Sequence, residues 1–518
     1  MKNRKLLPLI MTVVLCATMT IGALPVLANF NPTGYPIVDE PITLEMMARR
    51  SPIQPVWDDM GYFQEMEKLT NIKFKFRTAA GDDYTQAKQL ALASMDLPDL
   101  FFGGELTPND EADFGAQGIL IPLEDLIDQY APNFKKLIEE NPEIKASITA
   151  PDGHIYALPG IDQNITSKTP IMWLNGKWLE ALGVDKPETM DEFYELLKAF
   201  KEKNPGNVEE VIPLTAANAS ELRLGLLANF GLVQQDGIYV DDNGKVQLAW
   251  NQPEFKEYLK FMNRLYSEQL LDNQMFSHTW EQFVAKGKQV GVLSTWPIVM
   301  VGFHDVTEAM NYPVLPPMTS ATNPTKLTVE MSEIRRGRAA ITSKNQYPEA
   351  TMRWIDHAYS EEGTILARLG IEGKTFVWNE DGQWILLADE GLSTTQTNAK
   401  HAPGVGTNVP MVLTREFFEK EGGNPTILAI YEWISEELIP YAKLPFPLVY
   451  FTEDEIDVIN QYKMDIDTYF QQMEAKFITG AESIDKGWDK YVRTLNGIGL
   501  ADYLEAYQSA YDRWAKAQ

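Results

Sequence analysis

The chain has 518 residues, one cysteine and a formal net charge of −28, from 45 basic and 73 acidic side chains. This length predicts two to four domains at roughly 100–200 residues each, and the acidity excludes nucleic acid and anionic lipid as partners because both need clustered Lys and Arg. A single cysteine excludes a disulfide framework, and the sequence holds no Cys/His pattern with zinc-ligand spacing.

The N-terminal 28 residues predict a secretory signal peptide. Three basic residues at positions 2–5 precede an apolar run over 6–15, and Ala28 is a small residue at the expected cleavage site. Two alternatives stay open. The uncharged stretch 6–28 is about long enough for a membrane anchor. Cys16 is a candidate for lipid attachment, although a leucine precedes it where a lipoprotein signal has a small residue. We expect an exported protein, extracellular or at the cell surface.

The first part of the mature chain alternates strands with helices. Strand patterns cover residues 42–47, 72–76 and 100–102, and amphipathic helix patterns cover 57–71 and 84–95. Strand–helix–strand units of this length predict βαβ crossovers and a parallel sheet.

The alternation resumes further along. A strand pattern at 171–174 precedes a capping box and an amphipathic helix over 189–200, and another strand pattern covers 290–293. Asn243-Gly244 and Asp381-Gly382 each join two short strand patterns and predict hairpins. The C-terminal region is helical in pattern. No repeat or linker separates these segments, so the sequence predicts an α/β fold with two interwoven lobes.

Enzyme signatures are absent from the sequence. The five histidines show no metal spacing, and there is no nucleophile elbow, P-loop or dinucleotide-binding glycine triplet. A pair of catalytic carboxylates could be hidden among 73 acidic residues, but no pattern selects one. The acidic turn at 241–244 lacks the later oxygen ligands of a calcium loop, so a hairpin is the better interpretation. We predict a protein that is not an enzyme and holds no cofactor.

Tryptophans give the positive functional signal. Sugars offer flat C–H faces that stack on aromatic rings, while their hydroxyls bind carboxylates, amides and arginines. Several of the 12 tryptophans adjoin predicted loops or strand ends. The candidates for stacking are Trp57, Trp173, Trp280, Trp296 and Trp378. The competing interpretation is that each of them belongs to a hydrophobic core.

Ordered short motifs then suggest a family. They occur at residues 98–102, 115–123, 152–159, 174–193, 283–296, 347–350 and 488–500. In this order and spacing they resemble the family 1 extracellular solute-binding proteins, which serve carbohydrate ABC importers and include the maltodextrin-binding proteins. The later motifs resemble the long, lipoprotein-like subgroup that takes up oligosaccharides.

This resemblance implies a periplasmic-binding-protein-like fold, with two sheet-and-helix lobes and hinge crossovers between them. The expected boundaries are 1–28 for the signal peptide, 29–165 for lobe 1 with a returning segment near 300–365, and 166–299 for lobe 2, completed by 366–518.

The resemblance also implies ligand contacts. Trp296 matches the family's stacking tryptophan. Further contacts are implied at Gly103, Gly104, Glu105, Asp162, Trp173 and Asn175. Trp57, Trp280 and Trp378 are proposed on their chemistry more than on a motif.

The implied partners are an oligosaccharide and the membrane permease subunits of an ABC importer, with the protein itself a monomer. Some relatives bind calcium after the helix matching 188–203, but the loop Asn204–Glu210 lacks the Asp/Asn alternation, so we expect no calcium there. A secreted polysaccharide-degrading enzyme and a surface sugar sensor remain alternatives. The acidic composition disfavours acidic glycans unless the cleft concentrates basic groups such as Arg335, Arg336 and Arg338.

Overall fold

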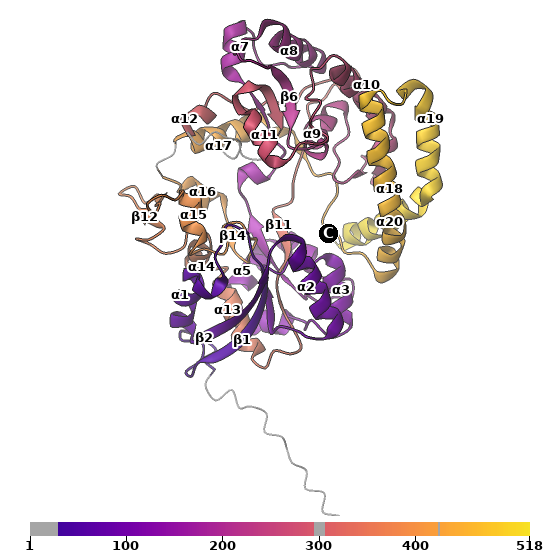
Figure 1. The fold of residues 1–518 in the computed structure, drawn as a ribbon. Helices are drawn as coiled ribbons and strands as arrows, with labels where there is room; N and C mark the ends of the chain where they lie inside the picture. Colours follow the sequence, from indigo (N-terminus) through magenta and orange to yellow (C-terminus); the bar gives the residue numbers. More distant parts are fainter. Residues whose placement is uncertain (1–29, 295–305, 423–424, 518) are drawn as a thin grey trace, which may run out of the picture.

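A computed structural model describes residues 30–294, 306–422 and 425–517 of the chain. The chain forms two α/β lobes, with the N-terminal strands in the lower lobe of Figure 1 and helices α7–α11 in the upper one. The signal segment with Cys16, and Trp296, lie outside the described residues. Within those residues, none of the helices combines the length and the apolar character needed to cross a membrane.

The first lobe is built on a six-stranded sheet in the order β14-β4-β11-β3-β1-β2. Its strands are parallel except β11, which is antiparallel to both of its neighbours. The expected parallel βαβ sheet is therefore confirmed. The strands are β1 Ile42–Arg49, β2 Ile72–Ala79, β3 Leu100–Phe102, β4 Leu158–Asp162, β11 Ile334–Ile341 and β14 Val412–Leu413.

Helices cover both faces of this sheet (Figure 1). Alternate residues of β1 point to opposite faces, as the strand period of two requires. Leu44 and Met46 join a core with α1, α4, α5 and α13, whereas Met47 joins a second core with α2 and Phe101. The helices are α1 Gly61–Thr70, α2 Gly81–Ser94, α3 Pro108–Ala116, α4 Glu124–Tyr130, α5 Pro132–Glu140, α6 Pro142–Ile148, α13 Pro348–His357, α14 Glu361–Arg368, α15 Thr394–Ala399 and α16 Arg415–Glu419.

The second lobe contains a three-stranded sheet in the order β5-β9-β6. The strands β5 Met172–Leu174, β6 Ile212–Ala216 and β9 Val290–Ser294 are almost wholly buried. The two predicted hairpins are confirmed as β7–β8, which belongs to this lobe, and β12–β13, which packs beside α14 and α16 of the first lobe. Their bounds are β7 Ile238–Val240, β8 Val246–Leu248, β12 Phe376–Trp378 and β13 Trp384–Leu386. The helices of this lobe are α7 Gly176–Leu182, α8 Met190–Lys203, α9 Ala219–Leu226, α10 Pro253–Ser267, α11 Trp280–Lys286, α12 Val306–Ala309 and α17 Pro425–Glu437.

Three C-terminal helices run along one side of both lobes (Figure 1). They are α18 Glu453–Thr479, α19 Ile484–Leu495 and α20 Ala501–Ala517. A capping box at Thr452 and Glu455 fixes the start of α18. This helix contacts α3 of the first lobe and α10 of the second, and its apolar residues join the second lobe's core.

Several segments cross between the lobes. The strand β4 leads directly toward β5, β11 enters the first sheet from the second lobe, and β10 Thr328–Val329 pairs with β15 Ala442–Lys443 beside them. The sequence prediction assigned residues 366–518 wholly to the second lobe. This assignment is wrong for Val412–Leu413, which pair with β4, and for the α14 residue Ala367, which lies in the first lobe's core. A two-residue strand leaves no hydrophobic pattern by which its return could have been recognised.

Candidate functional site

Polar residues gather at the edge of the first sheet that faces the second lobe. The parallel strands β1, β3 and β4 end there, and the antiparallel β11 begins there. Ligands of open α/β sheets bind beyond the carboxyl ends of the strands. Arg49, Glu105 and Asp162 end or follow these strands, and Arg335 begins β11. The sheet topology therefore brings together residues that are almost 300 positions apart in the sequence.

Glu105 lies between two arginines at this edge. Its carboxylate is 3.4 Å from Arg49 and 3.6 Å from Arg338. Burial, reinforced by neighbouring arginines and opposed by Glu105, lowers the pKa of Arg338. Arg338 Nε is buried and has no hydrogen-bond partner among the residues that the structure describes. One arginine of this cluster therefore keeps donor capacity that none of the described residues uses.

A pocket of about 190 Å³ opens beside Asp162, and we call it the arginine pocket. Arg335 is 3.6 Å from the Asp162 carboxylate and donates to the backbone oxygen of Ser332. Arg368 donates to the backbone oxygen of Gly404. The lining residues are Gly160, Ile161, Asp162, Asn164, Thr166, Ser167, Arg335, Arg368, Gly404, Asn408, Val409, Met411, Leu413 and Phe418.

Glu421 acts electrostatically on this pocket. Burial raises the pKa of its carboxyl to about 7, against the opposing attraction of Arg368. A carboxyl group with this pKa is only partly ionised at neutral pH. Glu421 therefore offsets only part of the positive charge of Arg368.

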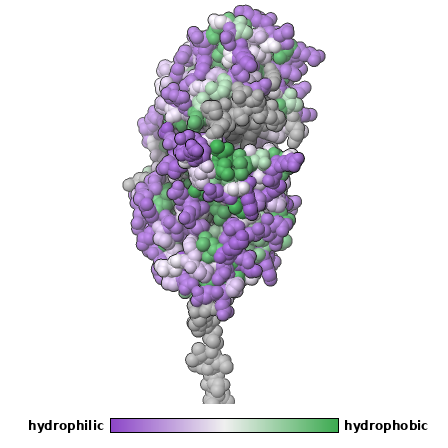
Figure 2. All heavy atoms as spheres, turned by 90° about the vertical axis from the view of Figure 1, so that its left-hand side faces the viewer, coloured by the Kyte–Doolittle hydropathy of each residue, from purple (hydrophilic) through white to green (hydrophobic). Residues whose placement is uncertain are grey.

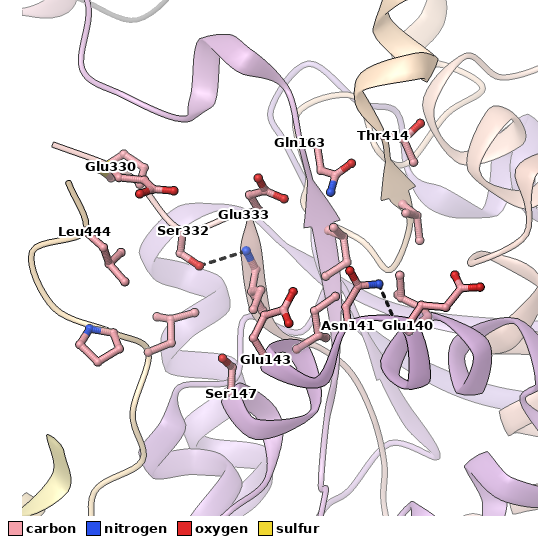
Figure 3. Close-up of a pocket in the computed structure, with 18 of the residues that line it drawn as sticks. Glu140, Asn141, Glu143, Ser147, Gln163, Glu330, Ser332, Glu333, Thr414 and Leu444 are labelled. Carbon is pink, nitrogen blue, oxygen red and sulfur yellow. Dashed lines mark hydrogen bonds between the residues drawn. The ribbon is translucent and has the colours of Figure 1, made fainter. Parts of the chain in front are cut away.

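A second pocket of about 490 Å³ lies at the same end of the sheet, and we call it the acidic pocket (Figure 3). Glu140 and Glu143 reach it from α5 and α6, and Glu330 and Glu333 reach it from the segment that enters β11. Glu333 forms an ion pair with Lys168. The remaining lining is apolar or uncharged, and includes Gln163, Ser332, Thr414, Leu444 and Trp514.

Gly103 and Gly104, predicted as ligand contacts, both lie where the chain closely approaches other parts of the fold. Gly103 has a φ of +66°, and a Cβ there would lie 3.0 Å from Thr407. At Gly104 a Cβ would lie 2.8 Å from the Cβ of Phe101. A side chain at Gly103 would press on the segment 407–409 that borders the arginine pocket, whereas one at Gly104 would collide with Phe101 of β3.

Two predicted stacking tryptophans are fully buried, which corrects their interpretation as platforms. Trp57 packs against Phe63 and donates to Gln54, which itself donates to the backbone oxygens of Pro403 and Val405. Trp173 lies in a second-lobe core. Neither ring presents a face to a ligand in this structure. Trp57 instead supports the segment that forms one wall of the arginine pocket.

The other predicted residues have different surroundings. Trp280 is 46% exposed and Trp378 is 37% exposed, so both rings are accessible, each at a separate element from the pockets. Asn175 is buried and caps α7, accepting from the Trp178 amide and donating to Val290 and Tyr312. Its amide therefore has a structural role.

Sequence reasoning missed Arg49, Arg368 and Asn408. Arg49 could have been found, because it ends the first predicted strand and strand ends of a parallel sheet converge. Arg368 and Asn408 carry no comparable signal. They lie in the segment assigned to the other lobe, and only the pairing of β14 brings them to the site.

The chain is similar to known proteins of one family. The profile described as "Bacterial extracellular solute-binding protein" matches residues 50–365. Two curated relatives are similar in sequence. The fructooligosaccharide ABC transporter substrate-binding protein FusA of Streptococcus pneumoniae serotype 4 is 31% identical over 92% of this chain and 91% of its own. Lipoprotein LipO of Bacillus subtilis is 25% identical over 64% of this chain and 67% of its own.

Two solved structures are also similar. FusA in complex with kestose has a TM-score of 0.79 at 29% identity, covering 92% of this chain and all of the other. Alginate-binding protein AlgQ2 without calcium ion has a TM-score of 0.74 at 26% identity, covering 93% of this chain and all of the other. The two-lobed architecture is thus matched over nearly the whole length.

Proposed function

The chain belongs to the bacterial extracellular solute-binding proteins, and we propose on this premise that it captures an oligosaccharide and delivers it to the permease of an ABC importer. One observation carries the proposal: the similarity to a fructooligosaccharide-binding transporter component extends over 92% of the chain and 91% of that relative. Family membership also makes the chain a non-enzymatic transporter component, and so removes the polysaccharide-degrading enzyme as an alternative.

The proposed binding region is the edge of the first sheet that faces the second lobe. Glu105 and Asp162, with the arginines beside them, supply charged hydrogen-bonding groups of the kind that bind sugar hydroxyls. Trp280 and Trp378 are proposed as accessible stacking rings, and Trp296 as the family's stacking tryptophan. This division follows burial, because a ring must be exposed before a sugar can stack on it.

We propose that ligand capture closes the two lobes on each other. The segments that cross between them serve as the hinge, with lobe 1 and lobe 2 divided near residue 165 and with residues 366–418 returned to lobe 1. A ligand that contacts both lobes stabilises the closed state, because only that state offers both sets of contacts. The closed monomer would then dock on the permease.

Export by a signal peptide cleaved after Ala28 remains part of the proposal. The relative LipO is named a lipoprotein, and Cys16 is the only residue of this chain that could carry a lipid through a thioether. Mass spectrometry of the protein from its native cells would distinguish a mature chain that starts at residue 29 from one that starts at a lipidated Cys16.

Binding is tested by titrating the mature chain with pools of fructo-oligosaccharides, glucans and uronate oligosaccharides. We expect one pool to change the tryptophan fluorescence and to give a saturable heat in isothermal titration calorimetry. Trp378→Ala should weaken that binding without changing the melting temperature, and Trp57→Ala should lower the melting temperature. The absence of a response to every pool would contradict the proposal.

A further inference from the structure

We propose that the arginine pocket binds a negatively charged group of the ligand, the carboxylate of a uronate-containing oligosaccharide. This inference rests on the proposed function and names the substrate class of the same site. The pocket is about 190 Å³, below the roughly 300–1,000 Å³ of pockets that hold a whole small-molecule ligand. It is therefore suited to one charged unit of a longer chain.

The charge of the pocket opposes that of the whole protein. Two arginines and one aspartate line it, in a chain with 28 more acidic than basic side chains. Arg49 and Arg338 extend the basic region along the same edge, where Glu105 is their shared partner. Concentrating cations in one place on an acidic protein creates a local field that attracts an anion.

Among the charged groups of the pocket the donors exceed the acceptors, with Arg335 and Arg368 against Asp162. The Asp162 carboxylate already accepts the backbone N–H of Asn164 at 3.0 Å. The side-chain oxygen of Asn164 accepts from the backbone N–H and the hydroxyl of Thr166, at 3.0 and 2.8 Å, and its NH₂ group donates to the Tyr431 hydroxyl, so Asn164 is engaged within the protein. A neutral sugar hydroxyl needs both donors and acceptors, whereas a carboxylate only accepts. The excess of donors therefore favours a carboxylate.

The arginines are held in place while keeping donors available. Arg335 gives one N–H to Ser332 at 2.6 Å, and Arg368 gives one to Gly404 at 3.1 Å. A guanidinium has five N–H donors in a planar fork that matches a carboxylate. The Arg335–Asp162 contact of 3.6 Å is longer than a hydrogen bond. A ligand carboxylate thus meets positioned guanidinium groups.

The test compares charged with neutral ligands on the full mature chain. Calorimetric titrations use oligogalacturonates and oligoalginates of three to six units against kestose and nystose. We expect the uronates to bind at least tenfold more tightly than the neutral sugars, and their affinity to fall tenfold or more between 20 and 300 mM NaCl. Arg335→Gln and Arg368→Gln should each weaken uronate binding at least tenfold.

Arg415→Gln is the matched control, because Arg415 is exposed, pairs with Glu419 and lies outside the pocket. It should leave uronate affinity unchanged. Tighter binding of the neutral sugars, or uronate binding that is insensitive to salt and to both variants, would overturn the inference while leaving the proposed function intact. If no sugar of either class binds, the proposed function fails as well. The salt series on the unmodified protein decides the question even if a variant does not fold.

Discussion

The arginine pocket and the acidic pocket lie at the same end of the same strands and carry opposite charge. Asp162 and Arg335 line the arginine pocket, whereas their chain neighbours Gln163 and Ile334 line the acidic one. Successive side chains of a strand point to opposite faces of the sheet. A one-residue step along β4 or β11 therefore moves a side chain from one pocket to the other. The strand period divides these strand side chains between the pockets, whereas the four glutamates of the acidic pocket come from α5, α6 and the segment before β11.

Reversing the charge of Arg335 in the arginine pocket should have the largest effect, a loss of ligand affinity. We expect Arg335→Glu to weaken binding of a uronate oligosaccharide by about 100-fold, since removing one partner of a desolvated charge pair costs on the order of 2–5 kcal/mol. Glu143→Lys, the same kind of reversal in the acidic pocket, should change the affinity by less than about threefold, because Glu143 is exposed outside the arginine pocket and salt screens exposed charges. Calorimetry on both variants measures the contrast, and equal losses would show that the two faces are not independent.

Titration of Glu421 gives the next largest effect. Its carboxyl has a pKa of about 7 in the folded protein, raised by burial above the ordinary 4.5. As the pH rises, the unfolded chain therefore loses this proton first, and the free energy of unfolding falls between about pH 4.5 and pH 7. One pKa unit corresponds to about 1.4 kcal/mol, so a rise from 4.5 to about 7 predicts a loss of about 3.5 kcal/mol over this range.

Glu421→Gln removes the titrating group, so its free energy of unfolding should no longer fall between about pH 4.5 and pH 7. Urea unfolding at pH 5 and pH 8 measures the difference for both proteins. Glu143→Gln, on the other face, serves as the control, and its curve should remain parallel to that of the unmodified protein. If the Glu421→Gln variant shows the same pH dependence of stability as the unmodified protein, the Glu421 carboxyl is ionised at an ordinary pKa.

A smaller effect is expected where β4 passes close to the segment after α15. A Cβ at Gly160 would lie 3.0 Å from the backbone oxygen of Val409. Gly160→Ala should therefore cost about 1 kcal/mol of stability by overpacking, and should weaken ligand binding a few-fold by moving one wall of the arginine pocket. Thermal unfolding and calorimetry measure the two effects. Gly153→Ala has open space around its Cβ but a φ of +91°, so it should lower stability and leave binding unchanged.

The smallest effect is expected from metal ions. Within the described residues there is no group of three or more His, Cys, Asp or Glu arranged to hold a metal. The four glutamates of the acidic pocket come as two pairs from two parts of the chain, Glu140 with Glu143 and Glu330 with Glu333. In the loop predicted to lack calcium, the Asn204 side chain bonds both polar backbone atoms of Val208. EDTA or 5 mM CaCl₂ should shift the melting temperature by less than about 1 °C; a larger calcium-dependent rise would reveal a site.

The sequence was a good guide to elements and a partial guide to the site. Period-two and helical patterns predicted β1, β2, β3 and the helices between them, because these patterns are local. Glu105 and Asp162 were also placed correctly at strand ends. Burial was not predictable in the same way. Trp57 adjoins a predicted helix start, and only its packing against Phe63 and Phe76 decides that the ring is enclosed.

The remaining site residues are brought together by pairing between strands that are far apart in the sequence. The sequence identified Arg335 and Arg338 only as basic residues that a cleft for an acidic glycan would have to bring together. Their position next to Asp162 and Glu105 depends on β11 running antiparallel between β4 and β3. Nothing within the two residues of β14 indicates that Arg368 and Asn408 return to this edge.

The contacts of Tyr450 affect how the C-terminal helices move with the lobes. The Tyr450 hydroxyl donates to Glu111 and lies 2.9 Å from the backbone oxygen of Ile148, while the Arg336 guanidinium stacks on its ring. This residue therefore anchors the entry to α18 in the first lobe, while the body of α18 packs on the second. A helix of 27 residues is roughly 40 Å long at 1.5 Å per residue. When the lobes rotate relative to each other, the displacement of a residue grows with its distance from the hinge. A spectroscopic label near Thr479, at the far end of α18, would therefore move farther than one beside the ligand.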